Sequence, residues 1–127
     1  MDRAEAITRI KQGLQRRSGR AWSVTGGRGT AWGWITVDAL PSRRTWHDYL
    51  PEGAPDLPRS YVEREESGKP FGHMSPADRA ELGRLLGLDA PCHMQGESIP
   101  AGGDYYREYV DRAEGRAPSV VGTPYWD

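Results

Sequence analysis

The sequence predicts a single α+β domain, in which about three helices pack on a small antiparallel sheet built on a Trp-rich β-hairpin. Three observations support this fold class. A chain of 127 residues has the length of one domain. Apolar residues recur at helical spacing in residues 3–17, 75–87 and 104–114. In residues 22–38, β-branched and aromatic residues flank a glycine-rich turn, which is typical of a hairpin.

The first helix is predicted over residues 3–17 and ends at Gly19. Its apolar stripe consists of Ala6, Ile7, Ile10 and Leu14. Arg16, Arg17 and Arg20 follow between this helix and the first strand. They could line an anion site beside the glycine-rich turn, or form a solvated basic end that complements the helix dipole.

The hairpin is predicted to join residues 22–25 to residues 30–38 through Gly26, Gly27, Arg28 and Gly29. A four-residue loop pairs Thr25 with Thr30, and therefore Trp22 with Gly33. Because side chains alternate along a strand, one face is wholly apolar and is expected to face the core. Its members are Trp22, Val24, Ala31, Gly33, Ile35 and Val37.

Two tryptophans, Trp32 and Trp34, lie on the opposite, polar face of the predicted hairpin. Large apolar rings are usually buried, so a helix or the long central loop could cover them. The alternative is an exposed platform on which a base or another flat ligand stacks.

The turn itself, from Gly26 to Gly29, is a candidate anion site. Successive backbone N–H groups in a glycine-rich turn can form an anion-binding nest, and the fork of Arg28 matches phosphate. The stretch lacks the lysine and the spacing of a P-loop. A hairpin turn also needs glycine whether or not it binds anything.

Charge is distributed unevenly along the chain. Residues 1–44 hold nine Lys or Arg and three Asp or Glu, whereas residues 45–127 hold eight and fifteen. The basic first third suggests an anionic partner, although the two parts could simply neutralise each other in the fold. The single cysteine excludes an internal disulfide and fits a reducing cytoplasm. No apolar run is long enough for a membrane span.

Residues 39–70 contain five prolines and are predicted to be mainly loop, with a short edge strand at residues 61–65. A loop of this length could contact a protein partner. The second helix is predicted at residues 75–87, with Ser75 as N-cap, Pro76 at the first position and Gly87 as the stop.

The last helix is predicted at residues 104–114, with Asp104 or Ser98 as its cap and Tyr105 exposed. A further strand could form at residues 119–121. Before this helix, residues 89–99 are predicted to be a loop that holds the polar residues to weigh for catalysis. His93 could act as a base, with Cys92 or Ser98 as nucleophile. Adjacent side chains in an extended segment point to opposite faces, so Cys92 and His93 cannot be each other's partners there. The alternative is a loop whose side chains satisfy neighbouring backbone groups.

Two segments, SVTGGRGTAWGWI and SIPAGGDYYREYVDRAEGRAPSVVGTPYWD, together resemble a family of small bacterial proteins of unassigned function. The likeness covers about two thirds of the chain and omits the proline-rich middle. It implies a soluble bacterial protein, and it brings no activity and no catalytic residues.

From these residues we expect a cytoplasmic, non-enzymatic protein that binds nucleic acid or a nucleotide phosphate. Its ligand-binding residues would be Gly26, Gly27, Arg28, Gly29, Trp32, Trp34, Arg16, Arg17 and Arg20. One alternative is a small enzyme that uses Cys92, His93 or Ser98, and another is a protein–protein adaptor that uses residues 39–70. No cofactor, metal or membrane partner is expected.

Overall fold

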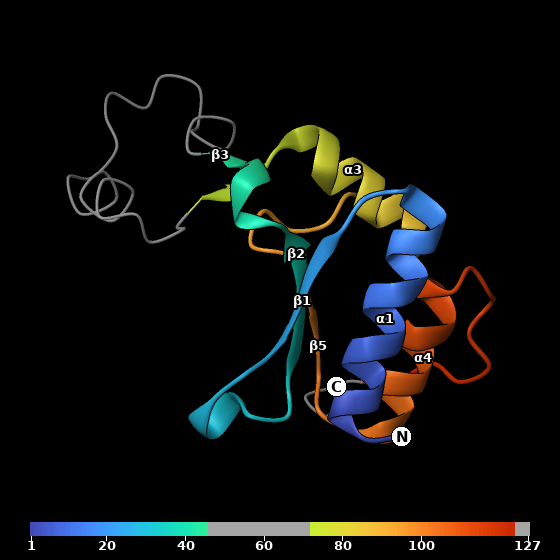
Figure 1. Ribbon diagram of the computed structural model, residues 1–127. Coiled ribbons are helices and arrows are strands. Elements are labelled where there is room, and N and C mark those ends of the chain that lie inside the picture. Colours follow the sequence, from blue (N-terminus) through green and yellow to red (C-terminus); the bar gives the residue numbers. More distant parts are fainter. Residues whose placement is uncertain (46–71, 124–127) are drawn as a thin grey trace.

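Three short antiparallel strands form the main sheet, and the three α-helices of the described residues pack around it (Figure 1). The computed structural model describes residues 1–45 and 72–123. Its α-helices and strands are α1 (Arg3–Ser18), β1 (Trp22–Gly26), β2 (Ile35–Ala39), β3 (Arg44–Thr45), β4 (His73–Met74), α3 (Pro76–Leu85), β5 (Glu97–Ile99) and α4 (Gly103–Ala113). Short 3-10 turns lie at Gly29–Ala31 and Pro41–Arg43. The predicted α+β class is confirmed.

The main sheet has the strand order β1-β2-β5, with the hairpin as its first two strands. β3 and β4 pair in a separate two-stranded sheet. β5 lies in residues 89–99, which the sequence indicated as loop. Three residues are too few for alternation to stand out in a sequence.

The predicted register of the hairpin is wrong. The two strands are connected by eight residues, 27–34, so Trp22 lies opposite Ala39 and not opposite Gly33. Within this connection the backbone N–H of Trp32 donates to Gly29 O, and that of Trp34 donates to Ala31 O, each over about one turn. These bonds coil residues that the sequence favoured as strand, so Ala31 is exposed and does not contribute to the core.

The predicted core face nevertheless holds for the residues that do lie in the strands. Val24 pairs with Val37 and not with Ala31, which is a shift of six residues. An even shift leaves every side chain on its own face. Trp22, Val24, Ile35 and Val37 are therefore all buried, as expected.

α1 and α4 lie side by side and cover one side of the sheet (Figure 1). Their contact is close because α1 carries Gly13, where a Cβ atom would lie only 2.9 Å from the carbonyl oxygen of Ala113. Asp2 caps the start of α1, where its carboxylate accepts the N–H of Glu5, and Gly19, with φ 73°, caps the end. Both ends agree with the sequence pattern, since glycine adopts this left-handed conformation without steric cost.

α3 packs near the end of α1 and confirms its predicted boundaries (Figure 1). The hydroxyl of Ser75 accepts the N–H of Asp78 at 3.2 Å, and Pro76 occupies the first helical position. Gly87 follows the helix with φ 66°. The residues that cap α3 could therefore be predicted from the sequence.

The predicted start of α4 is wrong. The N-cap is Gly102, which caps through no side chain, whereas Asp104 already lies inside the helix and Ser98 lies in β5. Tyr105, expected to be exposed, is half-buried and packs against the core. Residues 119–121 form no strand; their segment is tied to α4 instead, since Asp111 accepts the N–H of Ser119 at 3.1 Å.

Candidate functional site

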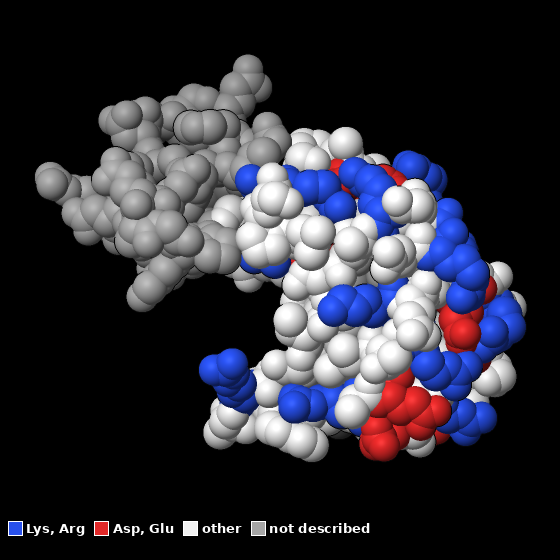
Figure 2. All heavy atoms as spheres, viewed as in Figure 1, with Lys and Arg blue, Asp and Glu red and all other residues white. Residues whose placement is uncertain are grey.

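The tip of the hairpin, residues 27–34, extends beyond the end of the sheet and is contacted by Arg3 of α1 and Tyr106 of α4 (Figure 1). We call these residues the hairpin tip. Trp32 is 60% exposed within it, and Arg28 is exposed as well. On the face shown in Figure 2, Lys and Arg side chains lie both at this end of the molecule and over the helices, and the visible acidic side chains lie over the helices.

Arg3, at the start of α1, holds the hairpin tip in place. Its guanidinium donates to Gly27 O at 2.8 Å and to Trp32 O, and its central carbon lies 4.1 Å from the centroid of the Trp32 ring. A cation over an indole face is a favourable contact. Arg3 therefore fixes both the loop backbone and the ring. No local pattern pointed to this residue, because it lies 24 and 29 positions from its partners.

The glycines of the tip have structural explanations. A Cβ atom at Gly26 would lie 2.3 Å from the Arg3 guanidinium, and one at Gly27 would lie 2.0 Å from Ala31 O. Gly29 has φ 60°, in the left-handed region that glycine adopts readily. The N–H of Gly27 donates to Trp34 O at 2.8 Å, so it is not available to an anion nest. Arg28 remains the candidate anion ligand of the turn.

The other predicted ligand residues are not all brought together at the tip. Trp34 immediately precedes β2 and is part-buried. Arg17 donates to Leu85 O, and Arg20 pairs with Asp78 at 2.7 Å, so both contact α3 at the opposite end of α1. Arg16 is exposed at that same end. The predicted anion site of these arginines beside the glycine turn is therefore not formed.

The predicted catalytic residues do not form a nucleophile–base pair. Cys92 is 1% exposed, and its burial raises the pKa of the thiol to about 12, so the thiolate is scarce at neutral pH. His93 is exposed, and its Nδ1 accepts the N–H of Gln95 at 3.2 Å. Ser98 is exposed on β5. Burial also lowers the pKa of His73, the first residue of β4, and so favours its neutral imidazole.

Within residues 1–45 and 72–123, no group of three His, Cys, Asp or Glu residues could hold a metal ion. No helix in those ranges has the length and apolar character needed to cross a bilayer.

The loop expected at residues 39–70 is replaced at its start by β2, a 3-10 turn and β3. The remainder, including the strand expected at residues 61–65, lies outside the described residues.

The chain was compared with models of protein families, with curated proteins and with solved structures, and none of them matches it. What it does must therefore be inferred from its own residues.

Proposed function

We propose that this chain is a small cytoplasmic, non-enzymatic protein that binds a base linked to phosphate, either a nucleotide or single-stranded nucleic acid, at the hairpin tip. The base stacks on Trp32, and Arg28 binds phosphate. The observation that carries this proposal is the 60% exposure of Trp32. Trp22, in the same hairpin, is fully buried, as is usual for so large an apolar ring.

The ring of Trp32 is preorganised for stacking. Arg3 contacts it at 4.1 Å and also binds the backbone carbonyl of the same residue. A ring that is already fixed loses less conformational entropy when a ligand orders it. Stacking on an aromatic side chain contributes about 1–3 kcal/mol per base and tolerates every base.

The charge around the ring is suited to phosphate. Among the described residues, neither Arg3 nor Arg28 forms a salt bridge with a carboxylate. Their positive charge is thus available to a ligand. A guanidinium also offers a planar fork of donors that matches phosphate oxygens.

The test is a titration with oligodeoxythymidylate and, separately, with a mononucleotide, monitored by tryptophan fluorescence. The signal of Trp32 is the difference between the wild type and Trp32→Phe. We expect quenching that saturates and an affinity that falls steeply with added salt. Arg28→Ala should weaken binding about fivefold or more, since a charge-assisted hydrogen bond is lost.

Lys11→Ala is the matched control, because Lys11 is an exposed cation of α1 outside the hairpin tip. It should bind as the wild type does. Binding that resists salt, equal losses in both variants, or no binding of either probe would refute the proposal. Preference for the oligonucleotide over the mononucleotide would identify a strand as the ligand.

A further inference from the structure

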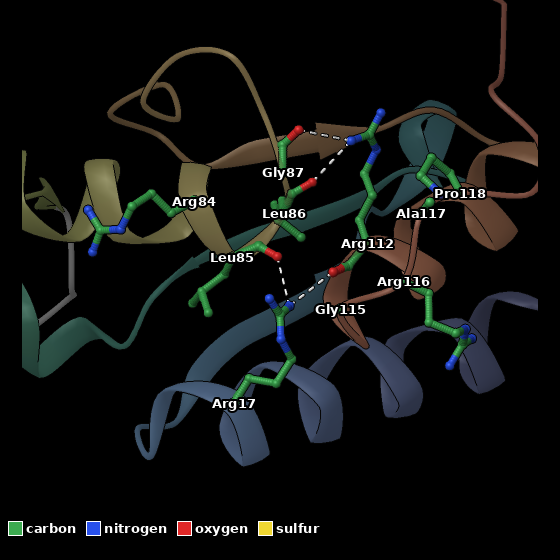
Figure 3. Close-up of a pocket in the computed structure, with 10 residues that line it drawn as sticks. All are labelled: Arg17, Arg84, Leu85, Leu86, Gly87, Arg112, Gly115, Arg116, Ala117 and Pro118. Carbon is green, nitrogen blue, oxygen red and sulfur yellow. Dashed lines mark hydrogen bonds between the residues drawn. The ribbon is translucent and has the colours of Figure 1, made fainter.

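A cleft of about 270 Å³ lies where the C-terminal ends of α1, α3 and α4 meet, far from the hairpin tip (Figures 1 and 3). Four arginines line it, namely Arg17, Arg84, Arg112 and Arg116, and none of the described Asp and Glu residues does. Its volume lies just below the roughly 300–1,000 Å³ of typical small-molecule sites, so it suits a compact ligand.

Arg17 and Arg112 are held in fixed positions by backbone carbonyls (Figure 3). Nη1 of Arg17 donates to Leu85 O at 2.7 Å and to the carbonyls of residues 112 and 113 at 3.0 Å each. Nη1 of Arg112 donates to Leu86 O at 3.1 Å and to Gly87 O at 3.2 Å. Within the described residues, Nη2 of each guanidinium has no hydrogen-bond partner.

The charges of the four arginines are not all balanced. Arg116 pairs with Asp111 and Glu114 at 2.9 Å each, and Nε of Arg112 donates to Glu108 at 3.0 Å. Among the described residues, Arg17 and Arg84 have no carboxylate partner. Arg17 faces only helix C-termini, whose partial charge is about half an elementary charge each. The ends of α3 and α4 together offset about the whole charge of Arg17, so Arg84 is the arginine of the cleft whose charge has no counterpart among the described residues.

The side chains in Figure 3 divide into two kinds. Arg17 and Arg112 lie against the chain between α3 and the end of α4, whereas Arg84 and Arg116 extend outward on either side. Arg84 is exposed, and its guanidinium has no hydrogen-bond partner within the described residues, whereas its backbone carbonyl accepts the N–H of Gly87 at 3.1 Å. It is therefore free to turn toward an anion that the two fixed guanidinium groups already bind.

We infer that this cleft is a second ligand site, which binds a compact oxyanion, namely inorganic phosphate or the phosphate group of a small molecule. The fixed guanidinium groups of Arg17 and Arg112 supply oriented donors, and Arg84 supplies an unpaired charge. This site is separate from the hairpin tip and does not depend on the function proposed for it.

Inorganic phosphate is the probe that tests the inference, with chloride at matched ionic strength as reference. Amide NMR spectra should show saturable, phosphate-specific shifts at residues 84–88 and 115–117, and none at the hairpin tip. Arg84→Gln removes an exposed guanidinium that has no partner within the described residues, so the fold should be unchanged. We expect it to weaken phosphate binding about fivefold, as the loss of one charge-assisted contact implies.

Arg107→Gln is the matched control, because Arg107 is an exposed arginine of α4 that does not line the cleft. It should bind phosphate as the wild type does. Arg84→Glu should reduce binding further through repulsion. Shifts that chloride reproduces, shifts confined to other residues, or equal affinity in Arg84→Gln and Arg107→Gln would overturn the inference. Arg28→Ala should leave these shifts unchanged, which separates the cleft from the hairpin tip.

A phosphomonoester titrated in the same way would identify the source of the phosphate. Tighter binding than inorganic phosphate would indicate a phosphorylated small molecule. Weaker binding would indicate the free ion.

Discussion

Each end of the hairpin has a tryptophan next to arginine, but one tryptophan is buried and the other is exposed. Trp22, at the start of β1, is fully buried, with the guanidinium groups of Arg20 and Arg43 at 5.3 and 4.7 Å from its ring. Trp32, in the hairpin tip, is 60% exposed beside Arg3. The same pair of residue types thus completes the core at one end and leaves a ring in solvent at the other.

The surroundings of the arginines explain this difference. At the Trp22 end, Arg20 and Arg43 also bind Asp78, whose side chain is only 6% exposed, so the cations are committed to the fold. At the Trp32 end, the partners of Arg3 among the described residues are two backbone carbonyls of the loop and the indole ring. A cation–aromatic contact therefore indicates a ligand site only where the ring is accessible and the charge has no carboxylate.

The largest expected contrast comes from removing each ring. Trp22→Ala should lower the free energy of unfolding by about 3–5 kcal/mol, because it leaves a cavity and removes the hydrogen bond from the indole Nε1 to Ser18 Oγ at 3.0 Å. Trp32→Ala should cost less than about 1 kcal/mol. Urea unfolding followed by circular dichroism measures both. Equal losses would contradict the assignment of the two rings, and Trp22→Phe should recover part of the larger loss.

A smaller contrast is expected between the arginines. Arg20→Ala removes one of the two cations on the buried carboxylate of Asp78 and should cost about 2 kcal/mol, reduced by the partial exposure of Arg20. Arg3→Ala should cost less than about 1 kcal/mol. Thermal unfolding would check the order. A greater loss in Arg3→Ala would mean that the tip supports the whole fold and not only its own loop.

The exposure of Trp32 can be measured without altering stability. Iodide should quench its fluorescence more strongly than caesium does, because Arg3 and Arg28 attract an anion to the exposed ring. The difference between the wild type and Trp32→Phe isolates this residue. Quenching that is unchanged in Trp32→Phe would show that the accessible indole lies elsewhere in the chain.

Acid should have the smallest effect and should act on the segment after α4, leaving the hairpin tip intact. The N–H of Ser119, together with Arg116, holds the pKa of Asp111 below its ordinary value. A lowered carboxyl pKa gives stability that is complete above the ordinary value of about 3.9 and is lost as the pH falls through the folded value. The amide signal of Ser119 should therefore move toward a disordered position below about pH 4, while that of Trp32 stays in place. In Asp111→Asn the Ser119 signal should not respond to acid.

The parts of the fold that the sequence predicted are those that local chemistry determines. The apolar stripe of α1, the Ser75 cap of α3 and the alternation around Val24 all act within a few residues. The length of the hairpin connection could not be predicted in this way. Three glycines indicated a four-residue turn, whereas the observed connection depends on Arg3, which comes from another element.

The candidate site was predictable to the same limited extent. Of the two tryptophans expected on the polar face, Trp32 is exposed and Trp34 is part-buried, and stacking of a ligand on Trp32 stays a prediction. Arg17 and Arg20 were expected beside the turn because they are close to it in sequence, but a strand separates the two ends of the hairpin. The cleft at the helix ends was not expected, because its arginines come from three separate helices and their ends.

Gly13, where α1 meets α4, affects the cleft although it does not line it. At Gly13 the two helices touch through their main chains, so their spacing is set by bare backbone. An alanine methyl group at this position would push α1 and α4 apart and move Arg17 relative to the carbonyls of α4 to which it donates. The width of the arginine-lined cleft therefore depends on Gly13, an uncharged residue one helical turn from Arg17.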